Sequence, residues 1–255
     1  MLFSGKSLAR YSLEATDGSI GRIEDFYFDD ESWVVRYLVV NANPWLPGEK
    51  KLLSPISVER IDPVEQTIIV DLTKEQIKNA PPMDTDRPVS RQQEVDFHRY
   101  FGYGLYWPGV SGAGLWGGSP MARNLVNQDP FEEEGMEAGL ADTNPNMRSV
   151  REIIGEFSGY DVSALDEKVG HADNVLIKDG SWDIQYIVTD TRRLLPGEHH
   201  VISTRVVQDV NWTQDHIKLT MTKEEVKRAP KYDPEDLTTT EEKRFYDHYH
   251  TSHRT

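Results

Sequence analysis

The chain repeats itself. Shifted by 149 residues it aligns with itself without a gap, and 19 of the 61 positions between residues 21 and 81 are identical. The block Leu-Pro-Gly-Glu at 46–49, for example, returns at 195–198. Self-similarity at a fixed offset is typical of a duplicated structural unit. We therefore expect two small domains with the same fold, each able to fold by itself.

The residues between the two copies have a different composition. Residues 102–148 are rich in Gly, Pro, Asn and acidic side chains and contain no Lys. They show neither the period of a strand nor that of a helix, which favours a disordered linker. The predicted domains are therefore residues 1–101 and 149–250, and residues 251–255 form a short tail.

The clearest strand in each copy begins at a tryptophan, Trp33 or Trp182. Residues 33–40 carry Trp, Val, Tyr and Val at the odd positions, and the second copy has Trp, Ile, Tyr and Val at the matching positions. Side chains alternate across a strand, so the face that stays apolar in both copies is predicted to be the core face. We expect further strands at 20–28, 52–54, 56–61 and 68–72.

Glycine and threonine mark the bends and ends of these elements. Gly21 and Gly170 occupy the same strand position, where a glycine indicates a bulge or a sharp bend. Thr73 and Thr222 are each followed three residues later by Gln or Glu. This spacing predicts a capping box at the start of a short helix.

A second short helix is expected near the end of each copy. It carries Phe97 and Tyr100 in the first copy and Tyr246 and Tyr249 at the same offset in the second. The predicted fold class is thus mainly β: two small β-barrels with short C-terminal helices, joined by a disordered linker. Closing a sheet into a barrel also removes free strand edges.

These patterns together resemble the PRC-barrel family. The likeness rests on Asp17-Gly18-x-x-Gly21, on residues 26–33, on residues 36–40, on Trp45-Leu46-Pro47-Gly48 and on the segment 70–78. It covers roughly residues 6–81 and 155–230, so the chain looks like two tandem PRC-barrel domains. The second copy departs from the pattern where Glu167 replaces the turn glycine and Thr204 replaces Pro55.

The resemblance implies a bacterial, non-enzymatic module, similar to the cytoplasmic domain of the photosynthetic reaction-centre H subunit. We expect a protein–protein interaction or regulatory scaffold whose partner the sequence does not identify. Two alternatives stay open. One is a peripheral subunit that influences photosynthetic electron transfer, and the other is a small-molecule or enzymatic site in a cleft between the barrels.

Composition excludes several classes. The chain has a net charge of −15 and no cysteine. Without cysteine there is no disulfide framework, thiolate metal site or cysteine nucleophile. The acidic charge argues against nucleic-acid binding, and no stretch of about 18 apolar residues predicts a membrane span. We expect a cytoplasmic protein; homo-oligomers and peripheral association with a membrane complex, through protein contacts, stay open.

No reactive set emerges from the motifs, so we expect no catalytic residue, cofactor or metal ion. The weak metal candidates are His248, His250 and His253, whose imidazoles could share an ion in a flexible terminus. His199 and His200 stand where the first copy has two lysines, and we expect them to be exposed polar residues.

Aromatic residues are the remaining candidates. Trp33 and Trp182 are predicted to pack in the core or against the hairpin. Tyr103, Tyr106 and Trp107 gather at the start of the linker. Exposed aromatic side chains of this kind suit docking to a protein partner. That they instead fold back onto the barrel is an equally weighted alternative.

Overall fold

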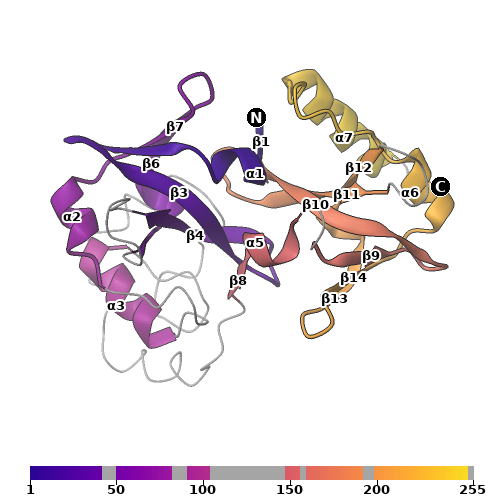
Figure 1. Cartoon of the computed structure of the whole chain (residues 1–255), viewed down its shortest axis with the longest axis horizontal. Coiled ribbons are helices and arrows are strands. Elements are labelled where there is room, and N and C mark those ends of the chain that lie inside the picture. The colour runs from indigo at the N-terminus through magenta and orange to yellow at the C-terminus, as the bar shows by residue number, and fades with distance from the viewer. Residues whose placement is uncertain (42–49, 82–90, 104–146, 156–158, 192–197, 252–255) are drawn as a thin grey trace. The chain divides into compact units, whose positions relative to one another are not determined.

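The computed structural model describes residues 1–41, 50–81, 91–103, 147–155, 159–191 and 198–251. The fold is mainly β, as the sequence predicts, and it contains two seven-stranded sheets (Figure 1). The chain divides into two compact units. We call Ala9–Arg148 with Gly180–Trp182 the N-unit, and Met1–Leu8 with Ser149–Asp179 and Asp183–Thr255 the C-unit. Most of the predicted linker, 104–146, lies outside the described residues.

The N-unit sheet runs in the order β5-β4-β3-β2-β7-β6, and β8 also pairs with β3. Its elements are β2 (Ser12–Ala15), β3 (Gly18–Asp29), β4 (Val34–Asn41), β5 (Lys50–Leu53), η1 (Pro55–Ser57), β6 (Val58–Asp62), β7 (Thr67–Val70), α2 (Lys74–Lys78), α3 (Arg91–Phe101) and β8 (Met147–Ser149). Strands β2 and β7 are parallel. Strands β5 and β6 stand at the two ends of this order and are joined by the single turn η1.

The C-unit sheet has the matching order β12-β11-β10-β9-β14-β13, and β1 also pairs with β10. Its elements are β1 (Leu2–Ser4), α1 (Gly5–Leu8), α5 (Val150–Ile153), β9 (Asp161–Ser163), β10 (Lys168–Lys178), β11 (Ile184–Asp190), β12 (His199–Ser203), η3 (Thr204–Val206), β13 (Val207–Asn211), β14 (His216–Leu219), α6 (Lys223–Arg228) and α7 (Thr239–Thr251). The two repeats therefore share one topology, strand for strand.

The glycines that the two copies share lie at a bulge in both sheets. On β3 the pairing jumps from Leu13–Gly21 to Glu14–Ser19, and on β10 it jumps from Val162–Gly170 to Ser163–Lys168. Gly21 has a φ of 154°, which favours glycine. At Gly170 a Cβ atom would lie 2.0 Å from the backbone oxygen of Asp190. The bulge inferred from sequence is present, and close backbone approach explains its glycine in the second copy.

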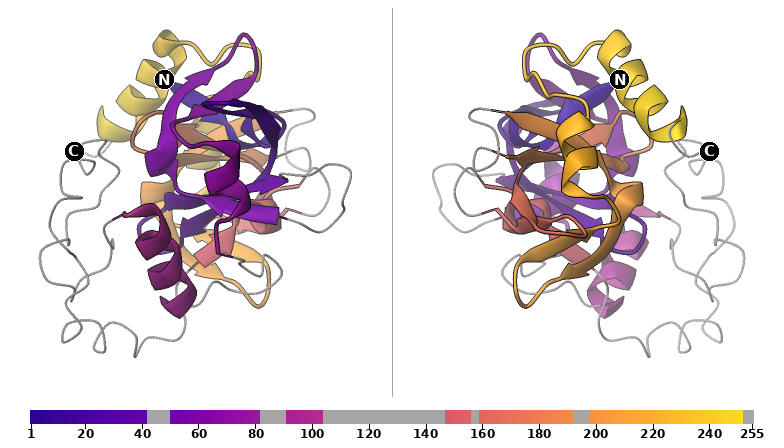
Figure 2. Two further views of the ribbon diagram at one scale, coloured as in Figure 1. Left: turned by 90° about the vertical axis from the view of Figure 1, so that its left-hand side faces the viewer. Right: turned by 90° about the vertical axis from the view of Figure 1, so that its right-hand side faces the viewer.

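Both faces of β4 are buried, which corrects the prediction of one core face. Tyr37 and Val39, on the face shared by the copies, pack under α3 in a cluster with Phe97. Leu38 and Val40 on the opposite face are completely buried as well. The left view of Figure 2 shows α2 and α3 on the outside of the N-unit strands, and the right view shows α6 and α7 on the outside of the C-unit strands. Because a helix covers the outer face of β4, apolar side chains are buried on both sides of this strand.

The last helix of the second copy is displaced by one residue from the predicted alignment. Phe97 is buried against Tyr37, but its predicted counterpart Tyr246 is 53% exposed. The residue that packs on the equivalent Tyr186 is Phe245. A helix turns by about 100° per residue, so Phe245 and Tyr246 point in different directions, and it is Phe245 that faces the sheet.

The two tryptophans do not begin the core strand. Trp33 and Trp182 have positive φ values of 57° and 61° and stand in the hairpin turn before β4 and β11. The extended alternation predicted from position 33 therefore starts one residue later, at Val34. A bulky side chain at positive φ is unusual and marks a defined turn in both copies.

The capping boxes are present as predicted. Thr73 accepts a hydrogen bond from the amide of Gln76, whose side chain accepts one from the amide of Thr73, and Thr222 does the same with Glu225. A second cap was not predicted: the carboxylate of Asp17 accepts a 2.8 Å hydrogen bond from the amide of Lys74. Asp166 repeats this contact in the C-unit. The identity of this aspartate in both copies is thus explained by helix capping.

His200 is completely buried, so the prediction of an exposed polar residue was wrong for it. Its Nδ1 donates a 3.0 Å hydrogen bond to the carbonyl of Ala229 at the end of α6. Lys51, at the same position in the N-unit, is also buried and donates to the carbonyl of Ala80. Lysine and histidine serve one purpose here, because either can donate to a carbonyl at a helix C-terminus.

Candidate functional site

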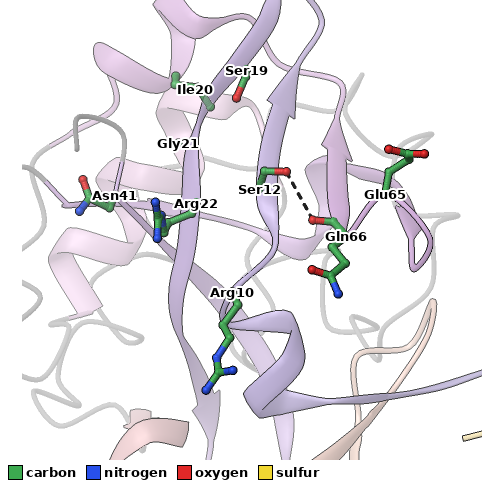
Figure 3. Close-up of a pocket in the computed structure, with 9 residues that line it drawn as sticks. All are labelled: Arg10, Ser12, Ser19, Ile20, Gly21, Arg22, Asn41, Glu65 and Gln66. Carbon is green, nitrogen blue, oxygen red and sulfur yellow. Dashed lines mark hydrogen bonds between the residues drawn. The ribbon is translucent and has the colours of Figure 1, made fainter. Parts of the chain in front are cut away.

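The N-unit carries an open pocket of about 580 Å³ beside the bulge in β3 (Figure 3). Its lining consists of Arg10, Ser12, Ser19, Ile20, Gly21, Arg22, Asn41, Glu65 and Gln66. Ser12, at the start of β2, is held beside Gln66, because the Ser12 amide donates a 3.0 Å hydrogen bond to the Gln66 carbonyl next to the parallel pairing of β2 with β7. The bulge, the hairpin after β6 and the segment before β2 therefore position its side chains.

The pocket is polar and carries more positive than negative side chains. Arg10 and Arg22 are both exposed, and Glu65 is the acidic member of the lining. Guanidinium groups have a permanent charge and bind carboxylates or phosphates through paired hydrogen bonds. Serine hydroxyls and the amides of Asn41 and Gln66 add further donors. The arrangement can bind an anionic group, and its charge stands out in a chain with a net charge of −15.

Asn41 is held in place by its neighbours. Its Nδ2 donates a 2.8 Å hydrogen bond to Oε1 of Glu24, and Nζ of Lys50 lies 3.6 Å from the other carboxylate oxygen of Glu24. These contacts join β3, β4 and β5 at the end of the sheet nearest the pocket. The amide is therefore pre-positioned by contacts outside the pocket lining.

The same place in the C-unit has different chemistry. The positions of Arg10, Arg22 and Asn41 are occupied by Gly159, His171 and Asp190. Lys168 there forms an ion pair with Asp161. The repeats thus share the strands and the bulge at this site but not the side chains that would bind a ligand.

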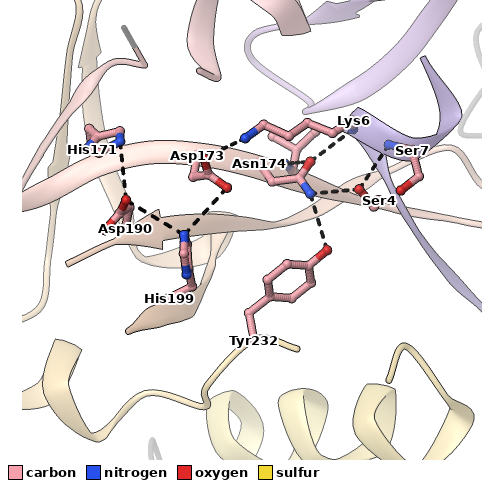
Figure 4. A network of polar contacts seen from close by, with 10 residues as sticks. Ser4, Lys6, Ser7, His171, Asp173, Asn174, Asp190, His199 and Tyr232 are labelled. Atoms are coloured by element: carbon pink, nitrogen blue, oxygen red, sulfur yellow. Dashed lines mark hydrogen bonds and ion pairs between the residues drawn. The ribbon is translucent and has the colours of Figure 1, made fainter. Parts of the chain in front are cut away.

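Next to that place, the C-unit contains a network of polar side chains (Figure 4). Nε2 of His199 lies 3.8 Å from a carboxylate oxygen of Asp173 and 3.8 Å from one of Asp190. Nε2 of His171 lies 3.7 Å from the same oxygen of Asp190. The carboxylate of Asp190 is fully buried. In the part of the chain that the structure describes, no such group has the geometry to hold a metal ion.

Asn174 connects this network to the first residues of the chain. Its Oδ1 accepts hydrogen bonds from the amides of Lys6 and Val175, at 3.1 and 2.9 Å. Its Nδ2 donates to Oγ of Ser4 at 2.7 Å and to the hydroxyl of Tyr232 at 3.3 Å. A side-chain amide offers two donors and an accepting oxygen, so Asn174 is fully used. It fastens three segments of the C-unit together.

Two tyrosines with raised pKa values lie where α7 packs on the sheet. Burial raises the pKa of Tyr186 to about 12, and burial also raises the pKa of Tyr249. The hydroxyl of Tyr249 donates a 2.6 Å hydrogen bond to the carbonyl of Val201. The ring of Tyr186 lies against the rings of Phe245 and Tyr249. These shifted groups are part of the packing under a helix, and neither belongs to the pocket lining.

Two of the predicted tail histidines, His248 and His250, do not come together. His248 is partly buried beside the ring of Tyr249, and burial lowers its pKa. His250 stacks on Tyr246, with its Nδ1 on the carbonyl of Tyr246 and its Nε2 on the guanidinium of Arg205. His253 lies outside the described residues. Residues two apart on a helix point to different sides, so His248 and His250 cannot share an ion in this conformation.

The other sequence candidates occupy structural positions. Gly21 and Gly170 form the bulges described above. Trp33 stacks on Phe28, and Trp182 is buried near the ring of Phe26. Their packing agrees with the hairpin role predicted for both.

The aromatic residues after α3 are only partly described. Tyr103 folds back to stack on Phe101 and packs against the cluster under α3. Tyr106 and Trp107 lie outside the described residues. For Tyr103 the fold-back alternative therefore holds.

Sequence reasoning missed Arg10, Arg22 and Asn174. Arg10 precedes the short strand β2 and Arg22 lies within β3, and the two follow no common period, so they give no signal in the sequence. Asn174 offers one: the first copy has Asp25 at its position, and a short polar side chain in a buried strand needs a fixed partner.

No helix within the described ranges is long and apolar enough to cross a membrane. No curated protein matches the chain. One family model matches, that of the PRC-barrel domain, over residues 13–77. This segment begins in β2, includes most of the pocket lining and ends in α2. The matching topology of the second repeat extends the likeness through the C-unit, although the family model itself covers only the first repeat. The chain therefore contains a PRC-barrel domain, at residues 13–77.

Proposed function

We propose that this protein is a binding scaffold rather than an enzyme, and that the N-unit pocket docks an acidic segment of a protein partner. The observation that carries the proposal is that the two units have different side chains at the same place in two sheets of matching topology. The helix caps and the bulges are the same in both units, while Arg10 and Arg22 of the pocket become Gly159 and His171. A duplicated scaffold can change its docking surface freely, whereas a reaction requires a fixed set of groups.

The chemistry of the pocket supports docking. Two permanent positive charges with hydroxyl and amide donors suit carboxylates, and such contacts steer association and set specificity. Glu65, on the hairpin, discourages a ligand of uniform negative charge and favours one with an acidic group at a defined position.

The proposal is tested by photo-cross-linking in extract of the source cells. A photoreactive residue replaces the exposed Ser19 in the full chain, and adducts are identified by mass spectrometry. We expect one or a few protein adducts that disappear in a variant with Arg10→Glu and Arg22→Glu. Lys218→Glu, a charge reversal of the same kind on the exposed face of β14, is the matched control and should leave the adducts unchanged. Adducts that survive the arginine reversal, or that contain no protein, would contradict the proposal.

A further inference from the structure

The first eight residues of the chain are part of the sheet of the second repeat. Strand β1 pairs antiparallel with β10, with Leu2 opposite Lys178, Phe3 opposite Ile177 and Ser4 opposite Leu176. Leu2, Phe3 and Leu8 are buried within the C-unit. We call Met1–Leu8 the N-arm. Burial of apolar side chains, together with a hydrogen-bonded ladder, makes the N-arm part of the C-unit core.

The N-arm also pairs with a part of the edge of β10 that β9 leaves open. Strand β10 pairs with β11 along one edge, while β9 covers only residues 168–171 of the other edge. The N-arm pairs with residues 176–178 on that remaining stretch. Without the arm these backbone groups would stay unpaired, which is costly in a buried strand and exposes a template for other chains.

Polar contacts fix the N-arm in register (Figure 4). Ser4 and the amide of Lys6 bind the side chain of Asn174, and Nζ of Lys6 lies 2.6 Å from a carboxylate oxygen of Asp173. Gly5 passes so close to β10 that a Cβ atom would lie 2.7 Å from Cγ2 of Val175. The contact surface is thus shaped for this segment.

The start of the second repeat makes the reciprocal contact. Strand β8, just before that repeat, pairs with β3 of the first repeat. Met147 lies in the buried cluster with Tyr37 and Phe97, and Nε of Arg148 donates a 3.0 Å hydrogen bond to the carboxylate of Asp30. Ser4 and Ser149 each cap the turn that follows their strand, by accepting from the amides of Ser7 and Glu152. The two segments are therefore equivalent.

A third segment of one repeat also belongs to the compact unit of the other repeat. The hairpin tip Gly180–Trp182, between β10 and β11, belongs to the N-unit. There the carbonyl of Trp182 accepts a 3.0 Å hydrogen bond from the amide of Val35, and its ring is buried.

We infer that each repeat is incomplete alone, and that its partner is another copy of the same repeat, which supplies the arm for its central strand. The two halves of this chain form such a pair within one molecule. Exchange of equivalent segments in both directions is the pattern of a two-fold symmetric, segment-swapped dimer. The arm contacts, and not only the covalent connection, then hold the halves together. This inference is independent of the proposed function.

The test uses the full, folded chain, cut by a specific protease at a recognition sequence placed between residues 104 and 146. We expect the two fragments to elute as one 1:1 complex in size-exclusion chromatography. Exchange of one fragment for an isotope-labelled copy, followed by mass spectrometry, should be slow. An excess of a synthetic peptide with the sequence of residues 1–9 should accelerate exchange at least 10-fold, and a scrambled peptide should not.

Variants of the N-arm provide the matched comparison. Gly5→Val introduces the clash with Val175 and should accelerate fragment exchange at least 10-fold. Ser7→Ala, in the same arm but with an exposed side chain, should exchange like the wild type. Should Gly5→Val fail to fold, the peptide competition on the unaltered arm decides alone. Fragments that separate immediately after cleavage, or exchange that neither the peptide nor Gly5→Val accelerates, would overturn the inference.

Discussion

Leu2 lies directly opposite Lys178 in an antiparallel ladder that joins the start of the chain to the second repeat. The neighbouring carbonyl of Met1 accepts a 2.9 Å hydrogen bond from the amide of Asp179. Leu2 and Lys178 therefore form a non-hydrogen-bonded pair, the closer of the two kinds in such a ladder. A slip of one residue would turn the buried side chain of Leu2 outward, so burial fixes this register.

Gly170 should not tolerate a side chain. Gly170→Ala would place Cβ against the backbone of Asp190, and we expect a loss of about 2 kcal/mol or more in the free energy of unfolding. Gly180→Asn is the control, because no atom lies within 4 Å of its Cβ position and Asn tolerates its φ of 79°. Chemical denaturation measures both. Equal stability of the two variants would argue against close backbone approach at the bulge.

Asn174 should contribute more to stability than Asn211, an asparagine at an exposed turn. Asn174→Ala leaves buried hydrogen-bonding groups on the N-arm without their partner, which typically costs about 1–3 kcal/mol. Asn211 accepts hydrogen bonds only from amides of its own exposed turn, so Asn211→Ala should cost less than about 1 kcal/mol. Urea titration of each variant gives the comparison, and a smaller loss for Asn174→Ala would contradict the network described here.

Substitutions at two adjacent residues of α7 should have very different effects on the free energy of unfolding. Phe245 is buried against Tyr186, so Phe245→Ala should lower the free energy of unfolding by about 3–5 kcal/mol. Tyr246 is exposed, and Tyr246→Ala should change it by about 0.5 kcal/mol. Thermal melts of the two variants check the helix register. A larger loss of stability for Tyr246→Ala than for Phe245→Ala would instead support the pairing of Tyr246 with Phe97 that the sequence offset predicts.

Stability should fall in strongly alkaline solution. Burial raises the pKa of Tyr186 to about 12, above the ordinary value of 10.0, so the folded state binds the phenolic proton more tightly than the unfolded state. The resulting stabilisation is complete below pH 10 and is lost as the pH rises toward 12. Tyr249, whose pKa burial also raises, adds to the same effect.

This pH dependence can be measured by circular dichroism between about pH 8 and 12, with tyrosinate absorbance followed in parallel. Tyr186→Phe removes one ionising group and should make the alkaline loss of stability smaller. Tyr246→Phe, at an exposed position, is the control and should leave it unchanged. An unaltered alkaline limb in Tyr186→Phe would show that this buried phenol does not limit stability.

Much of the fold follows from local patterns in the sequence. The capping boxes at Thr73 and Thr222 and the bulges at Gly21 and Gly170 depend on neighbouring residues, so one copy suffices to predict them. Alternation identified the face of β4 that lies under α3 but not the opposite buried face of Leu38 and Val40, because a period-two pattern does not show what packs on the second side of a strand. The one-residue displacement of Phe245 escaped the gapless alignment for the same reason: it depends on packing, not on sequence identity.

The exchanged arms could not be predicted from the sequence. Two copies of a repeat offer two nearly equivalent acceptor strands, so Leu2 and Phe3 carry no information about which of them they join. The ranges 1–101 and 149–250 differ from the observed units for this reason. The pocket was missed because Arg10 and Arg22 follow no periodic pattern and make no motif.

The most direct measurement uses engineered disulfides, since the chain has no cysteine of its own. The double variant Leu2→Cys/Lys178→Cys tests the observed pairing, and Leu2→Cys/Asp29→Cys tests pairing with the equivalent strand of the first repeat. Non-hydrogen-bonded antiparallel neighbours have the Cα separation that a disulfide needs. After oxidation, mass spectrometry should find a disulfide in the first double variant and free thiols in the second. A disulfide only in the second double variant would show that the arm binds its own repeat and would contradict arm exchange.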